Sequence, residues 1–226
     1  MAPPPAPWPR LRESWWVFAL AGVALAVFVL GLVEDVRCRP ARCSGTAAER
    51  LLSLDALGGL PRLYTTGLFV AVAVLGWLAR TRSAGRAELW WTAVAGIGAV
   101  LAVAKLVSAH SSAKGSSALG TLVAGVVLTV VALAVLTVTG RRWGVASAQP
   151  MVLALGVYAA AALGLDAVTS FVVSLQDGVG PLTRAAATFA EELGEALAAL
   201  LLLVTLRWNL PAAGPPASLS TRRPPG

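Results

Sequence analysis

Long apolar runs separated by short polar segments set the pattern of this chain. Six such runs cover residues 16–33, 63–78, 89–107, 119–139, 151–175 and 188–206. A helix that crosses a bilayer needs about 20 mostly apolar residues, because it rises about 1.5 Å per residue. The pattern therefore predicts an all-α membrane protein, a bundle of about six transmembrane helices within residues 15–208. The second run is the shortest; it either begins earlier, at residues 60–62, or lets Arg80 and Arg82 snorkel to the interface.

The two ends of the chain do not follow this pattern. Residues 1–14 and 209–226 are rich in proline and have no apolar periodicity. Segments of this kind bury too little apolar surface to fold. We expect two disordered tails that flank the membrane domain. The first apolar run is too long for a signal peptide, and no small-residue cleavage site precedes Glu34 and Asp35, so we interpret it as an uncleaved anchor.

The composition supports a membrane protein and argues against other classes of protein. Hydrophobic residues make up 57% of the chain and charged residues only 13%, which is too apolar for a soluble domain of this length. The formal net charge of +7 invites a nucleic-acid interpretation. However, the basic residues stand singly or in pairs at the ends of the apolar runs, where topology signals and headgroup contacts belong. We therefore expect a lipid bilayer, and no nucleic acid, as the surroundings of this protein.

Two independent patterns predict the orientation. With the N-terminus inside, most arginines outside the first long loop fall on the cytoplasmic side, as the positive-inside rule requires. Tryptophan anchors at membrane interfaces, and all eight tryptophans fall on the same side if six helices alternate: Trp8, Trp15, Trp16, Trp77, Trp90, Trp91, Trp143 and Trp208. We predict a multi-pass protein of the bacterial plasma membrane with both termini in the cytoplasm.

The first loop holds the two cysteines and a helix signal. Cys38 and Cys43 enclose a short segment, and an exported loop favours a disulfide between them; free thiols or a metal site remain as alternatives. Thr46 and Glu49 have the spacing of a capping box. The apolar positions that follow, up to Gly58 and Gly59, predict a short amphipathic helix on the extracytoplasmic side.

The last apolar run carries the most informative polar residues. Glu191, Glu192 and Glu195 lie within about a 100° arc of a helix whose remaining surface is leucine and alanine. An ionised group in the middle of a bilayer costs from about 2.5 to more than 10 kcal/mol. This face of the helix therefore points toward protein or water, and the opposite face toward lipid.

Further polar residues fall in the same, outer half of the predicted bundle. Asp166 lies at a depth similar to that of Glu195, with Thr169 and Ser170 on its face of the fifth run. Lys105 lies near the outer end of the third run, and the single histidine, His110, follows it in a loop.

This polar cluster has two interpretations. It forms either a hydrated pocket, in which the carboxylates bind ions or protons and Lys105 is a counter-charge, or an internal set of charge pairs that holds helices together. Small residues at four-residue spacing, such as Gly156, Ala160 and Gly164, allow close approach of helices but do not identify the pairs.

The sequence argues against an intramembrane enzyme. One histidine cannot supply a zinc site or the several histidine motifs of prenyl-protease-like enzymes, and Ala196 stands where the E-E-x-x-x-R motif needs arginine. Gly164-Leu165-Asp166 lacks the fourth residue of the G-x-G-D signature, and no nucleotide motif is present. We expect no enzymatic activity, no cofactor and no bound metal.

Asp166 followed by the segment EELGEALAALLLL resembles the C-terminal helix pair of small uncharacterised multi-pass bacterial membrane proteins. The resemblance implies a membrane bundle and no particular activity. Our leading hypothesis is a transport-like protein that handles ions or protons. The alternative is a non-catalytic membrane subunit or scaffold that binds another membrane protein, or a copy of itself, through its acidic face and small residues.

Overall fold

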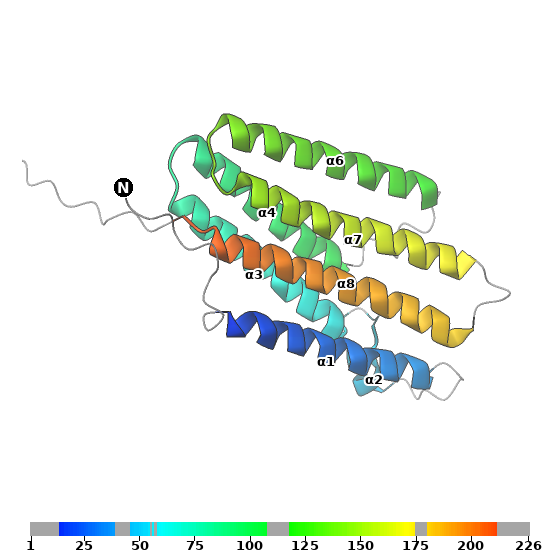
Figure 1. Ribbon diagram of the computed structural model, residues 1–226. Coiled ribbons are helices and arrows are strands. Elements are labelled where there is room, and N and C mark those ends of the chain that lie inside the picture. The colour runs from blue at the N-terminus through cyan, green and yellow to red at the C-terminus, as the bar shows by residue number, and fades with distance from the viewer. Residues whose placement is uncertain are drawn as a thin grey trace, which may run out of the picture.

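The computed structural model describes residues 14–38, 46–54, 56, 58–107, 118–174 and 180–211, and within these ranges every regular element is an α-helix (Figure 1). The helices are α1 (Trp15–Cys38), α2 (Ala47–Leu52), α3 (Leu60–Thr81), α4 (Arg86–Val107), α6 (Ala118–Arg142), α7 (Ala148–Ser174) and α8 (Pro181–Trp208). The predicted all-α class is confirmed. Each of the six long helices contains most or all of one predicted apolar run and extends beyond it at one or both ends.

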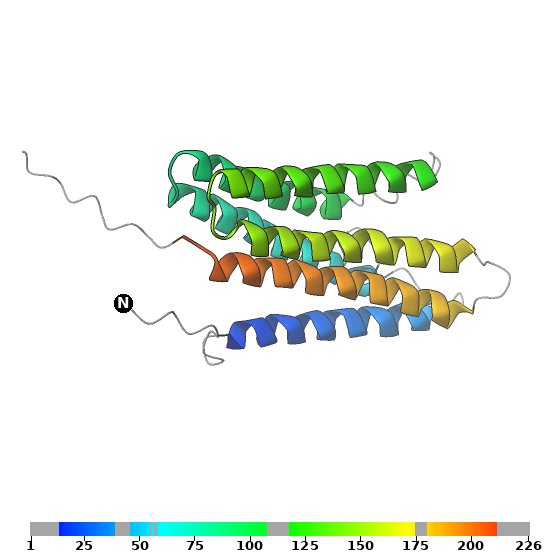
Figure 2. The same ribbon diagram turned by 45° about the horizontal axis from the view of Figure 1, so that its top comes forward.

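The six long helices run up and down in one bundle (Figures 1 and 2). The short α3–α4 and α6–α7 turns lie at one end, together with the start of α1 and the end of α8. We call this the short-turn end. At the opposite end, the long-connection end, α1, α4 and α7 finish and α3, α6 and α8 begin.

Helix α8 lies at the centre of the bundle. It packs against α1, α3 and α7, while α3 packs along α4, and α6 lies at the edge, mainly against α7 (Figure 2). Buried residues of α8 such as Ala199, Leu202 and Leu206 join the main apolar core. Side chains on the faces of α8 that contact α1, α3 and α7 therefore lie in the interior of the bundle.

In the part of the chain that the structure describes, five helices are long and apolar enough to cross a membrane: α1, α3, α4, α6 and α7. Many of their large apolar side chains are exposed, for example Val100 on α4 and Leu128 on α6. An apolar surface of this extent fits lipid and not water. Helix α8 is at least as long as these five, but it is set apart from them by the three glutamates within its apolar stretch.

Glycines bring α3 and α4 unusually close. A Cβ placed on Gly98 would lie 2.8 Å from the backbone nitrogen of Ala73, and one on Gly76 would lie 3.0 Å from the backbone of Ala95. The small residues predicted at four-residue spacing on α7 do not produce such a close contact between helices. A Cβ on Gly156 meets only Leu133, at 3.9 Å, so none of the described helices packs tightly on Gly156.

The short helix α2 covers the long-connection end of α1. The predicted capping box is confirmed, because the Glu49 backbone donates to Thr46 Oγ1 and the Thr46 backbone donates to Glu49. The helix ends at Leu52, earlier than Gly58 and Gly59 suggested. The chain then inserts Leu54 into the core, where its side chain lies so close to Gly31 that a Cβ there would be 2.7 Å away.

Two tryptophans that we assigned to the membrane interface lie in the core instead. Trp90 and Trp91 are each only 1% exposed and stack edge to face, with ring centroids 5.0 Å apart. Trp90 Nε1 donates to the Leu136 carbonyl oxygen at 3.0 Å, which satisfies its buried N–H and joins α4 to α6. These two residues therefore stabilise the bundle and do not act as anchors, although they still lie toward the short-turn end.

Some predictions concern residues outside the described ranges. They are the disordered tails, apart from a few residues at their inner edges, the bridge between Cys38 and Cys43, and the loop that holds His110.

Candidate functional site

Three of the predicted site residues form a buried ion-pair cluster that joins α4 to α8. Lys105 Nζ lies 3.0 Å from Oε1 and 2.9 Å from Oε2 of Glu192, and 2.8 Å from Oε2 of Glu195. We call Lys105, Glu192 and Glu195 the paired triad. Its ammonium group contacts two carboxylates at once, so the strongest attraction available to each charge comes from within the triad.

Helix geometry explains this arrangement. Glu192 and Glu195 are three residues apart and hence neighbours on one face of α8. Lys105 lies in the last turn of α4, where the partial negative charge of the helix end favours a cation. The close α3–α4 contact and the central position of α8 bring these two faces together.

The triad is almost completely shielded. Glu192 and Glu195 are 8% and 4% exposed, and the Lys105 side chain is 9% exposed. Removing one partner of such a cluster leaves an uncompensated buried charge, which costs about 3–5 kcal/mol. The interpretation as internal charge pairing therefore describes these three residues well.

Two residues that the sequence did not single out lie beside the triad. Arg62 is buried in the first turn of α3, and its guanidinium acts electrostatically on Glu192. The ring of Tyr158 on α7 packs edge to face on Phe69, with centroids 4.9 Å apart, and lies within electrostatic range of Glu192 and Glu195. With Arg62 included, two cations balance two carboxylates.

A sequence signal for Arg62 exists. We allowed the second apolar run to begin at residues 60–62, and Pro61 stands next to Arg62; proline favours the first turn of a helix. The helix therefore begins at Leu60, and Arg62 belongs to α3. For Tyr158 there is no comparable signal, because only the packing of α7 against α8 brings it to the triad.

The third glutamate belongs to a different group. Glu191 is half-buried and turns toward α7, where it interacts electrostatically with Asp166 and lies within hydrogen-bonding reach of Thr169. We call Glu191 and Asp166 the carboxylate pair. Ser170, predicted on the same face, is exposed and is not among the groups that act on Glu191. The acidic face of α8 is thus divided between two neighbouring helices.

The two groups have different chemical capacities. In the paired triad, hydrogen bonds and opposite charges already occupy the carboxylates. In the carboxylate pair, the groups that act on Glu191 are one hydroxyl and three carboxylates. Carboxylates that interact electrostatically repel each other when both are ionised, and a proton or a cation relieves this repulsion. The carboxylate pair is therefore the part of the cluster with capacity to take up a positive charge.

The comparison with known proteins identifies a family. Residues 20–210 match the model of the family described as Domain of unknown function (DUF8692), and the chain belongs to this family. No curated protein and no solved structure matches the chain. The family match spans the bundle from within α1 to the end of α8, and it brings no activity with it.

Proposed function

We propose that this member of the DUF8692 family is a multi-pass membrane protein that takes up and releases protons or small cations at the carboxylate pair. The observation that carries the proposal is the position of Glu191 opposite Asp166, with Thr169 beside them, at the junction of α7 and α8. Oxygen ligands and proton acceptors at membrane depth are typical of ion and proton pathways.

The paired triad has a supporting role in this proposal. Because Lys105 holds Glu192 and Glu195, those carboxylates fix the position of α8 and leave the carboxylate pair as the exchangeable part. The half-buried state of Glu191 and Asp166, compared with the buried triad, supports access from one side of the bundle.

The orientation is part of the proposal. We infer that α8 is a sixth crossing, that the protein resides in a bacterial plasma membrane, and that the short-turn end, with Arg141 and Arg207, faces the cytoplasm. The positive-inside rule supports this arrangement. The carboxylate pair then faces the extracytoplasmic side. Reporter fusions after Arg86 and Arg142 should report the cytoplasm, and an outside signal at either position would contradict it.

A second candidate is a scaffold without ion exchange, as in the alternative hypothesis from the sequence. The buried charge pairing between α4 and α8 favours it, because such pairing holds helices together without any ligand. In neither case do we propose an enzymatic reaction or a cofactor.

One experiment separates the two candidates. The purified full chain in liposomes that contain a pH-sensitive dye is exposed to proton, sodium or potassium gradients. We expect a flux that Glu191→Gln or Asp166→Asn abolishes while the thermal stability in detergent changes little, because an amide keeps the shape but loses the charge.

Glu88→Gln is the matched control, since Glu88 pairs with Arg80 near the opposite end of the bundle. This variant should retain the flux. The absence of flux in the native chain under every gradient, or a large loss of stability in Glu191→Gln, would contradict ion handling and favour the scaffold.

A further inference from the structure

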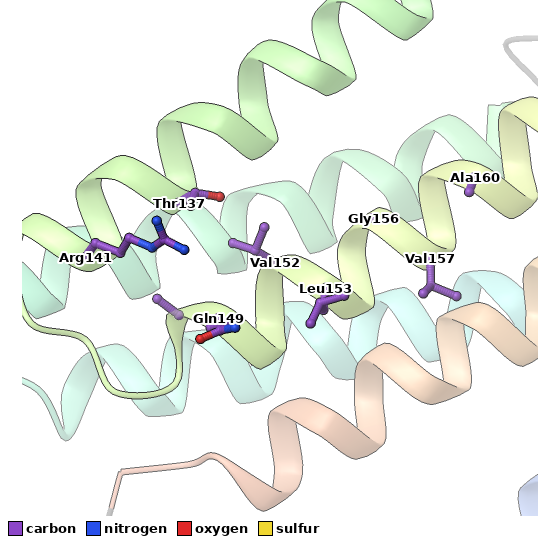
Figure 3. Close-up of a pocket in the computed structure, with 9 residues that line it drawn as sticks. Thr137, Arg141, Gln149, Val152, Leu153, Gly156, Val157 and Ala160 are labelled. Carbon is purple, nitrogen blue, oxygen red and sulfur yellow. The ribbon is translucent and has the colours of Figure 1, made fainter.

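A groove of about 440 Å³ runs between α6 and α7, and none of the residues of the acidic cluster lines it (Figure 3). Arg141 and Gln149 lie at its short-turn end, and Val152, Val157 and Ala160 follow along α7. The groove is therefore polar at the end of the bundle and apolar toward its middle. This polarity matches the polarity of a lipid molecule in one leaflet.

The floor of the groove is formed by small residues. Gly156 and Ala160 line it, and only Leu133 comes within 4 Å of a Cβ placed on Gly156. In most small-residue stripes a second helix fills the space. Here the described part of the chain leaves the space open along α7, between exposed Leu153 and the edge helix α6.

The mouth of the groove is suited to an anion. Arg141 is exposed in the last turn of α6, and the described residues include no acidic partner for it. Gln149 lies in the first turn of α7, and its side chain is exposed beside Arg141 at the mouth of the groove. A guanidinium and a side-chain amide are together a favourable environment for a phosphate.

A second groove repeats this arrangement. It measures about 460 Å³, is lined by apolar residues of α1, α3 and α8, and has Arg207 at the same, short-turn end. Two grooves on different helix pairs thus combine an apolar interior with an arginine at the level of the headgroups. A partner helix would need no such charge at this position.

From these features we propose that the α6–α7 groove is a binding site for one anionic phospholipid. An acyl chain lies along Gly156 and Ala160, and the phosphate group lies between Arg141 and Gln149. The occupant is a lipid and not a free phosphate, because most of the groove is apolar. This site is independent of the carboxylate pair and of its proposed function.

Native mass spectrometry of the purified full chain tests the proposal. After addition of phosphatidylglycerol or phosphatidylcholine, we expect stronger retention of phosphatidylglycerol. Arg141→Gln should lower that retention about fivefold, the factor expected for one arginine beside an anionic headgroup. Arg142→Gln is the matched control, because Arg142 carries the same charge at the next position and does not line the groove.

A second pair of variants tests the apolar part. Gly156→Leu places a side chain in the groove, at a position where an added Cβ meets only Leu133 at 3.9 Å, and should reduce retention of both lipids. Gly164→Leu, on the same helix but not in the groove lining, should have no effect.

Three results would overturn the proposal. The first is equal loss in Arg141→Gln and Arg142→Gln, which would indicate only a general attraction to basic surface. The second is displacement of phosphatidylglycerol by inorganic phosphate, which would make the anion and not the lipid the ligand. The third is a dimer of the native chain that dissociates in Gly156→Leu. This result would show that a helix of a second copy occupies the groove.

Discussion

Helices α6 and α8 are of similar length but take opposite places in the bundle. Within α6 the residues before Arg141 include no charged side chain, yet this helix lies at the edge with Leu128 71% exposed. Within α8 three glutamates interrupt the apolar stretch, yet this helix is surrounded by α1, α3 and α7. The helix with the charges is the central one.

This arrangement is the reverse of that in a soluble bundle, where the polar helix faces the solvent. In lipid, apolar surface gains little from burial, so close packing and polar contacts decide which helices associate. The charged residues of α8 make contacts that favour its central position. Helix α6 has no such residues before Arg141 and can face lipid.

The largest expected effect comes from breaking the charge pairing of α8. Lys105→Met strands two buried carboxylates and should lower the free energy of unfolding by about 3–5 kcal/mol. Thermal unfolding in detergent would measure it.

The matched control removes all three charges of the triad. Lys105→Met combined with Glu192→Gln and Glu195→Gln should recover part of the loss, because no carboxylate of the triad is then left without its ammonium partner. Strictly additive losses would show that these residues are not coupled, and α8 would then owe its central place to apolar packing alone.

A somewhat smaller effect is expected when α6 receives a charge. Leu128→Arg near the middle of α6 should make the free energy of membrane insertion less favourable by about 2.5–3.5 kcal/mol, because no opposite charge among the described residues lies there to pair with the arginine. The fraction of integrated chains, measured by protease protection, should fall, whereas Leu128→Ile should leave it unchanged. Full integration of Leu128→Arg would mean that α6 faces protein or water, and the contrast between the two helices would fail.

The smallest effect concerns a single methyl group. In α8 a Cβ on Gly194 would lie 2.5 Å from the Leu165 side chain, whereas in α6 a Cβ on Gly125 would lie 3.4 Å from Leu163. Gly194→Ala should therefore cost on the order of 1 kcal/mol through overpacking, and Gly125→Ala less than about 0.5 kcal/mol. Equal melting temperatures for the two variants would show that α8 is not packed more tightly than α6.

The sequence predicted the number and order of the long helices because each apolar run has the length of a crossing. It also predicted the cap of α2, since Thr46 and Glu49 satisfy the first turn by contacts within four residues. Both depend on local chemistry. The location of Lys105 and the glutamates in the same half of the bundle followed from counting residues along antiparallel helices.

Features that depend on which helices are neighbours were not predictable in this way. The pattern put Glu191, Glu192 and Glu195 on one face, but that face meets α4 on one side and α7 on the other. Trp90 and Trp91 have the composition of interface anchors, and only the packing of α4 against α3 and α6 buries them. Helical periodicity shows which residues share one face of a helix. It does not show which neighbouring helix packs against that face.

The central place of α8 also has a consequence for biosynthesis. It is the last of the described helices to leave the ribosome, yet α1, α3 and α7 pack against it and it supplies both carboxylates for Lys105. Until it is made, α4 holds an ammonium group in the membrane without Glu192 and Glu195. A translation product that stops before residue 181 lacks both the centre of the bundle and the partners of that charge. The core can therefore be completed only after α8 is made, and a truncated chain leaves the charge of Lys105 without these two partners.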